Sequence, residues 1–198
     1  MLQLMGRTPS TDVEDGLLTA AEQILVNEGP AGLTVRKVAA CAGVAPMGVY
    51  SRFQGKTGLL EALFVRGFDT LTAMIGGATG ADALARLRDA GLRYREFAIT
   101  HPEHYRLMFE RKHEVDPGPA AQERAYASFG HLVDMVAAAR SLRPLGLGTD
   151  IEVAQQLWSA LHGAVSLELL GMLFDEDPSM SFERMLDAVL LGMEQQAG

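Results

Sequence analysis

The chain has 198 residues, of which 48% are hydrophobic, and its formal net charge is −8 at pH 7. This length and apolar content can bury a sizeable core, as one compact body or as a small domain attached to a larger one. The sequence has no apolar stretch of about 18 residues and no basic and apolar leader ahead of Thr11, so it predicts neither a membrane span nor a signal peptide. Its single cysteine, Cys41, cannot form an internal disulfide, and we expect a cytoplasmic protein.

The negative charge is unevenly distributed along the chain. Up to Phe68 there are six basic and six acidic residues, so the whole deficit lies beyond this point. Arg36, Lys37, Arg52 and Lys56 fall within one short segment. The acidic chain thus keeps a local basic segment, and contacts with nucleic-acid phosphates need no more than that.

Helix-forming residues dominate, and no segment alternates β-branched or aromatic residues with polar ones as a strand does. The pattern therefore predicts an all-α fold. The first helix is expected at about 12–28, where a continuous apolar stripe precedes Gly29 and Pro30.

The next segment, 34–56, predicts two short helices joined by a tight turn. Thr34 is a good N-cap, and Val38 and Ala39 then lie on one helical face. Gly43 can adopt the left-handed conformation that a sharp turn requires. This is the layout of a helix-turn-helix, and the alternative is a helical hairpin that only packs.

The second short helix begins at Pro46, where the missing N–H costs nothing, and it turns Val49 and Phe53 inward. In a helix-turn-helix the first residues of this helix meet base edges in the major groove. Ala45, Pro46 and Met47 occupy that place and lack hydrogen-bonding side chains. We therefore expect thymine methyl contacts and DNA shape to carry more of the specificity than bidentate hydrogen bonds.

These residues closely resemble the DNA-binding region of the TetR family of bacterial transcriptional regulators. The shared elements are a Thr-led helix, the Ala-Gly-Val turn at 42–44 and the Tyr-x-x-Phe-x-x-Lys ending at 50–56, and the likeness extends over 12–28 and 59–60. Ala45 and Gly55 depart from the pattern, since a polar residue and a capping Ser or Asp are common there. The resemblance implies phosphate contacts from Thr34, Tyr50 and Lys56. The whole expected DNA-binding set is Thr34, Arg36, Lys37, Ala45, Pro46, Met47, Tyr50, Ser51, Arg52 and Lys56.

We predict a helix-turn-helix domain at 1–56 and a helical regulatory and dimerisation domain at 57–198. A helix from about 57 to 75 connects the two, as the resemblance implies. Further helices are expected at 82–100, 103–110, 120–140, 150–174 and 182–195, between breaks that contain proline or glycine.

A second and less specific motif, Trp158 with His162 and Gly163, resembles a TetR subgroup named for Trp, His and Gly at this place. The helices around it carry matching apolar stripes, which predict a four-helix homodimer interface. A symmetric dimer lengthens the DNA site that is read, whereas the alternative is that both stripes serve the subunit's own core. The expected interface residues are Leu157, Leu161, Ala164, Val165, Leu169, Leu186, Val189, Leu190 and Met193.

A regulator of this type needs a cavity whose ligand prefers one of two conformations. The candidates are aromatic and methionine side chains with few polar groups, as in many small-molecule pockets, and the alternative for each is core packing. The histidine among them is equally a candidate for a structural or interface role. The expected set is Tyr94, Phe97, Tyr105, Met108, Phe109, Phe129, Met135, Trp158 and His162.

The sequence does not favour an enzyme or a cofactor. His101, His104 and His113, near Glu103 and Glu110, are metal-ligand types, but their arrangement straddles a proline and matches no strong ligand spacing. We expect no metal, no catalytic residue and no membrane partner, and we find neither a phosphate loop nor a nucleophile elbow.

The sequence hypothesis is a homodimeric repressor that binds a palindromic operator and is released by a small apolar or aromatic effector. The alternatives are an activator, a regulator controlled by a protein partner, and a helical ligand-binding protein or enzyme that does not bind DNA.

Overall fold

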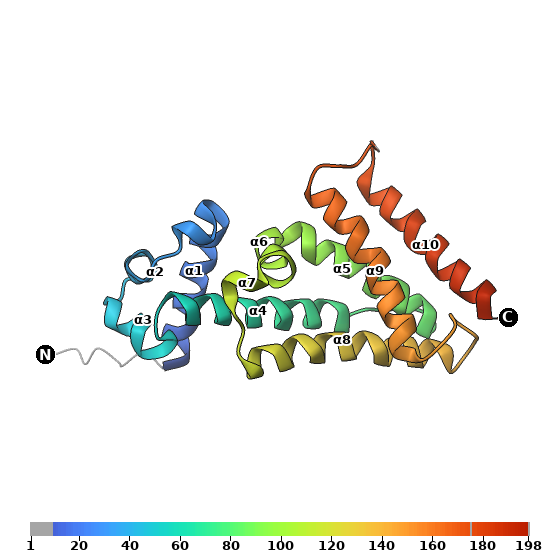
Figure 1. Cartoon of the computed structure of the whole chain (residues 1–198), viewed down its shortest axis with the longest axis horizontal. Helices are drawn as coiled ribbons and strands as arrows, with labels where there is room; N and C mark the ends of the chain where they lie inside the picture. The colour runs from blue at the N-terminus through green and yellow to red at the C-terminus, as the bar shows by residue number, and fades with distance from the viewer. Residues whose placement is uncertain (1–9, 175, 198) are drawn as a thin grey trace, which may run out of the picture.

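The computed structural model describes residues 10–174 and 176–197, and every regular element in these ranges is a helix. The all-α prediction is confirmed. One long helix and two short ones form a head at one end of an elongated molecule, and the last two helices lie at the other end (Figure 1). Within the described part of the chain, no helix is both long and apolar enough to cross a membrane.

The head consists of α1 (Ser10–Gly32), α2 (Val35–Cys41) and α3 (Pro46–Phe53). Helix α1 bends at Gly29, which has φ 67° and ψ −176°, and the chain then resumes a short helical turn at Pro30. This turn explains why α1 reaches beyond the predicted end at residue 28. Leu17, Leu25 and Val49 have no more than 1% of their surface exposed and form the centre of the head.

The turn between α2 and α3 has the chemistry that the sequence predicts. The Thr34 side chain accepts a hydrogen bond from the Lys37 N–H and caps α2. Gly43 has φ 68°, a left-handed conformation that a side chain would strain, and Val44 N–H donates back to Ala39. Pro46 occupies the first turn of α3. The orientation of α3 against α2 is therefore set by local backbone chemistry.

Helix α4 (Lys56–Gly76) joins the head to the body. It contacts α1 and α3 near its start and packs along α5 and α8 further on. Leu59, Leu63 and Phe64 have at most 1% of their surface exposed. The buried face of α4 thus contributes to the core of the head and to the core of the body.

The body contains α5 (Ala83–Thr100), α6 (Pro102–Tyr105), the π-helix η1 (Arg106–Glu110), α7 (Lys112–Val115), α8 (Pro119–Arg140), α9 (Asp150–Leu169) and α10 (Pro178–Ala197). Three predicted boundaries differ. The expected helix at 103–110 is an α-turn followed by a π-turn, α9 ends at Leu169 instead of 174, and α10 begins at Pro178 instead of 182. Helix α9 stops early because Gly171 has φ 66° and its N–H returns to the Glu168 carbonyl.

The stripe that we assigned to a dimer interface faces inward for most of its length. Leu157, Val165 and Leu186 are at most 1% exposed within one chain, and such side chains have no surface left for a partner. The interface assignment is therefore wrong for the six buried residues, and the alternative, that the stripes serve the subunit's own core, holds for them. These six are Leu157, Leu161, Val165, Leu186, Leu190 and Met193, whereas Ala164, Leu169 and Val189 are only partly buried.

Candidate functional site

The outer face of the head is formed by the start of α3 and by α2. Met47 is 72% exposed and Tyr50 52% exposed, while Val49 and Phe53 hold α3 from beneath. Ala45 makes no side-chain cap, in keeping with the absence of a polar side chain there. The remaining predicted DNA-contact residues are also exposed, apart from half-buried Arg52; they are Thr34, Arg36, Lys37, Pro46, Ser51 and Lys56.

Contacts within the head engage several of its positive charges. Lys37 is paired with Glu28, and the Lys56 Nζ donates a 2.7 Å hydrogen bond to the Pro30 carbonyl. The Arg36 guanidinium has no ion pair among the described residues. Arg36 is therefore the cation of the head that is most available to a phosphate, while Lys56 also ties the start of α4 to the end of α1.

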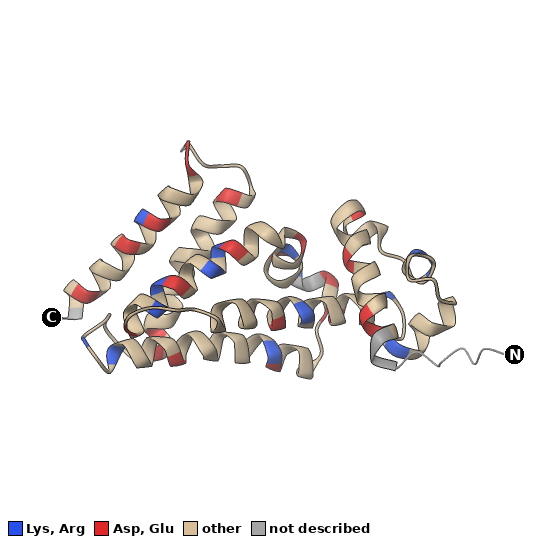
Figure 2. Cartoon of the chain, turned by 180° about the vertical axis from the view of Figure 1, so that it is seen from behind, with Lys and Arg blue, Asp and Glu red and all other residues tan. Residues whose placement is uncertain are grey.

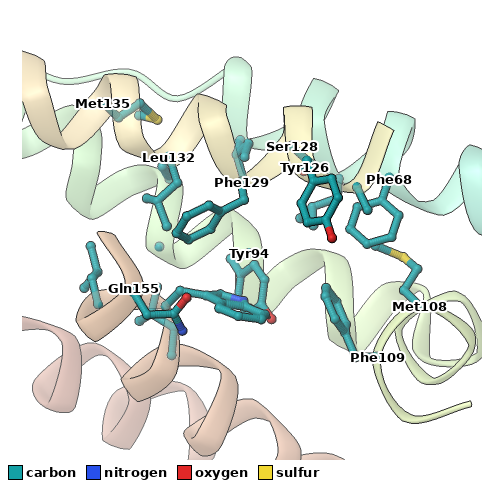
Figure 3. A pocket seen from close by; sticks show the side chains of 18 of the residues that line it. Phe68, Tyr94, Met108, Phe109, Tyr126, Ser128, Phe129, Leu132, Met135 and Gln155 are labelled. Carbon is teal, nitrogen blue, oxygen red and sulfur yellow. The ribbon is translucent and has the colours of Figure 1, made fainter. Parts of the chain in front are cut away.

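A cavity of about 560 Å³ lies in the body between α4, α5, η1, α8 and α9 (Figure 3). Six of the nine predicted pocket residues line it: Tyr94, Met108, Phe109, Phe129, Met135 and Trp158. The prediction that Phe97, Tyr105 and His162 line it is not borne out by the structure. Phe97 and Tyr105 are fully buried in the packing, and His162 lies behind the wall.

The wall of the cavity is held by a cluster of hydrogen-bonded rings. The Trp158 Nε1–H donates to the Tyr94 hydroxyl over 3.2 Å. The His162 Nδ1 lies 2.9 Å from the Tyr94 hydroxyl and 2.7 Å from the Tyr105 hydroxyl, and Ser166 Oγ lies 3.3 Å from the latter. Burial lowers the pKa of His162 and raises those of both tyrosines. The cluster is therefore uncharged at neutral pH, and the two tyrosine hydroxyls meet at the His162 Nδ1.

Sequence reasoning missed two groups of lining residues. Phe64, Phe68, Leu71 and Ile75 come from α4, which the sequence assigned only to the connection between head and body. Tyr126, Ser128 and Gln155 supply polar groups, and Leu157 and Leu161, predicted for the dimer, line the cavity instead. The helical spacing of 125, 128, 129, 132 and 135 on α8 is the signal that could have found the second group.

The same region contacts the head through α6. His104, next to Tyr105, places its Nε2 3.3 Å from a carboxylate oxygen of Glu22 on α1, and the Arg66 Nε of α4 lies 3.0 Å from the same oxygen. Burial acts to raise the pKa of Glu22, but His104 and the Arg66 charge outweigh it and hold that pKa below its usual range. The Glu22 carboxylate of α1 thus links the head to both α4 and α6.

The histidines near α6 have other contacts where their side chains are described. In the described part of the chain, no group of three or more His, Cys, Asp or Glu side chains is placed to hold a metal ion. The His113 side chain lies outside the described residues. His101 stacks on Phe97, with ring centroids 5.4 Å apart, and its Nδ1 lies 2.8 Å from the Thr100 hydroxyl.

Comparison with known proteins assigns the two parts of the chain that carry these sites to one family. Residues 17–63 match the model of "Bacterial regulatory proteins, tetR family". Residues 87–189, just over half of the chain, match "Tetracyclin repressor-like, C-terminal domain". The chain belongs to the TetR family. Its members are transcriptional regulators that bind DNA, and the narrower Trp-His-Gly subgroup stays a prediction.

Individual relatives agree with this TetR assignment. The chain is 29% identical over 194 residues to an uncharacterized HTH-type transcriptional regulator of Mycobacterium tuberculosis, covering 95% of this chain and 84% of that one. It is 31% identical over 118 residues to the HTH-type transcriptional activator FasR of Mycolicibacterium smegmatis, covering 59% and 54%. A solved structure from Rhodococcus sp. RHA1, of unknown function, is 28% identical with a TM-score of 0.83, covering 98% of this chain and 100% of that chain.

Proposed function

We propose that this TetR-family chain is a repressor that binds a palindromic operator as a homodimer and leaves it when a small apolar or aromatic effector enters the cavity. The observation that carries this proposal is that α4 supplies one cavity wall and also begins against the head. A DNA-binding regulator acts where the DNA is, so we place the protein in the cytoplasm.

The proposed release follows from the contacts of α4 and α6. A ligand against Phe64 and Phe68 favours the position of α4 that accommodates it, and α4 is tied to the head through Lys56 and Arg66. A ligand against Tyr94 reaches the head by a second path, through Tyr105 and the adjacent α6. If the favoured position spaces two heads wrongly for the operator, the ligand lowers DNA affinity by its preference for that position.

A homodimer in this proposal uses the outward faces of α9 and α10. Leu167, Leu170 and Leu191 are 45%, 63% and 54% exposed there, beside the half-buried Val189. Two heads read two half-sites and double the phosphate contacts that dominate affinity. Because the relative FasR is named as an activator, activation is the second candidate function. Transcription in vitro with and without the protein distinguishes repression from activation.

The DNA-binding part is tested by selecting binding sites from random DNA with the intact protein and two variants. Met47→Ala removes an exposed side chain at the start of α3 and should change the selected sequence. Arg36→Ala should weaken all sites about equally and lower the salt slope by about one. Leu142→Ala is the control, because Leu142 is also exposed but follows the end of α8, outside both the head and the proposed dimer face.

Two results would count against the assignment. An unchanged selected site for Met47→Ala would remove Met47 from the base-facing set. Failure of the intact protein to bind any DNA in a salt-dependent and sequence-dependent way would overturn the regulator as a whole.

A further inference from the structure

Among the described residues, none with a charged side chain lines the cavity. Its polar members are Tyr94, Tyr126, Ser128, Gln155 and Trp158, and all the others are apolar. A smaller hollow along α8 has the opposite character, since Asp69, Arg124 and Asp134 line it, and Ser128 borders both hollows. An ionised group buried without a partner costs several kcal/mol, so a cavity of this composition discriminates strongly by ligand charge.

The ring cluster at the back of the cavity does not supply a counter-charge. The Tyr94 hydroxyl already accepts from Trp158 and lies in hydrogen-bond contact with His162. His162 itself is behind the wall, and burial lowers its pKa, which keeps the imidazole neutral. Glu110, whose charge acts on His162, is exposed and is not among the lining residues. The cluster can therefore orient a neutral group, but it cannot compensate an anion.

Among the described residues, Ser128 and Tyr126 are the polar lining residues without a side-chain hydrogen bond, and Ser128 is the buried one of the two. It is 5% exposed, and it lies on the α8 face that also carries Ala125, Phe129 and Leu132 to the cavity. No hydrogen bond of its hydroxyl is formed with any described residue, whereas Ser159 on α9 donates to the Gln155 carbonyl. The hydroxyl keeps some accessible surface, so it can bond to a ligand without first breaking a bond to the protein.

The rim of the cavity is polar but also uncharged. Tyr126 is 70% exposed, and Gln155 is exposed on α9 (Figure 3). The Gln155 Nε2 donates to the Ser159 hydroxyl over 3.1 Å. A ligand that enters past Tyr126 and Gln155 contacts hydrogen-bonding groups that carry no charge.

We propose that the cavity selects an uncharged molecule with an aromatic or aliphatic body and one hydroxyl or carbonyl group, which bonds to Ser128, and that it rejects ionised analogues of the same size. This inference rests on the proposed ligand-released function and narrows its effector to a chemical class. Ser128 is the residue that recognises the polar end, and the aromatic walls hold the body.

Four matched probes test the charge selectivity in the absence of DNA: phenylbutanol, pentylbenzene, phenylbutanoate and phenylbutylammonium. Trp158 is the only tryptophan of the chain and lines the cavity, so its fluorescence reports binding directly. Phenylbutanol should bind at least about tenfold more tightly than either ion. Equal or tighter binding of phenylbutanoate or phenylbutylammonium would overturn the proposal and leave the DNA-binding function intact.

The role of Ser128 is tested with the two uncharged probes. Ser128→Ala should weaken phenylbutanol about two- to tenfold and leave pentylbenzene unchanged, and Ser128→Thr should restore most of the loss. Ser141→Ala is the control, because Ser141 is exposed after α8 and is not a lining residue. Equal loss for both probes would assign Ser128 to packing. Absence of a Trp158 response to all four probes would overturn this inference together with effector release, whereas the site-selection experiment judges DNA binding separately.

Discussion

At the scale of single residues, burial decides the protonation state of His162. The sequence offered this histidine as a ligand contact or as a structural residue, and the structure places its Nδ1 within hydrogen-bond distance of two buried tyrosine hydroxyls behind the cavity. Lys56 also combines a predicted functional role with a structural one. Its exposed position suits a phosphate, yet its ammonium already bonds to the Pro30 carbonyl and holds α1 against α4.

The lowered pKa of His162 predicts a pH dependence of stability. Above about pH 6.5 the histidine is neutral in both the folded and the unfolded chain. As pH falls below this value the unfolded chain takes up a proton that the folded chain resists, so stability is lost until the pH reaches the lower folded pKa. The midpoint temperature of thermal unfolding should therefore fall less steeply with acidification in His162→Gln than in the native protein. His131→Gln is the control, and an unchanged slope in His162→Gln would refute the assignment.

At the scale of elements, the helix-turn-helix is determined locally and the cavity wall is not. The α2–α3 turn needs only Thr34, Gly43 and Pro46 in the right order. The π-turn η1, by contrast, brings Met108 and Phe109 into the cavity, and its extra residue per turn depends on packing against α4.

Two glycines of the head give a matched test at this scale. Gly43 has φ 68°, so Gly43→Ala should destabilise the protein by about 1–2 kcal/mol and weaken DNA binding by disturbing α3. Gly48 lies inside α3, where an added Cβ would meet Val44 at an ordinary 3.7 Å. Gly48→Ala should therefore stabilise by up to about 1 kcal/mol. Urea unfolding measures both free energies, and a neutral Gly43→Ala would contradict the local origin of the turn.

At the scale of the whole molecule, acidic residues on α10 are paired inside one chain. Arg88 of α5 binds Asp187 and Glu183, and Arg143 binds Glu194. Figure 2 shows the mainly acidic charge along α10, and these pairs neutralise it. The acidic side chains of α10 are therefore already paired within the chain, whereas the exposed Arg184 has no ion pair among the described residues.

The proposed dimer predicts the effect of one charge on its face. Leu191→Asp should convert the dimer to a monomer in analytical ultracentrifugation, because a carboxylate would be buried against a second apolar helix. Operator affinity should then fall about 100-fold or more, since the two heads no longer bind as one unit. Leu142→Asp, at a 67% exposed leucine beyond α8, should change neither property. A persistent Leu191→Asp dimer would place the interface elsewhere.

The sequence by itself determined the helical class, the head and the exposure of the residues at the start of α3, because caps, turns and amphipathic spacing act over a few neighbouring residues. Six cavity residues could also be predicted, since aromatic and methionine side chains are rare enough to stand out. Only the tertiary structure decided which face of α9 and α10 is inward, that α4 forms a cavity wall, and that Ser128 is unpartnered. A buried stripe has the same spacing whether it packs against its own chain, a ligand or a second copy, and the three-dimensional arrangement of helices far apart in sequence distinguishes these roles.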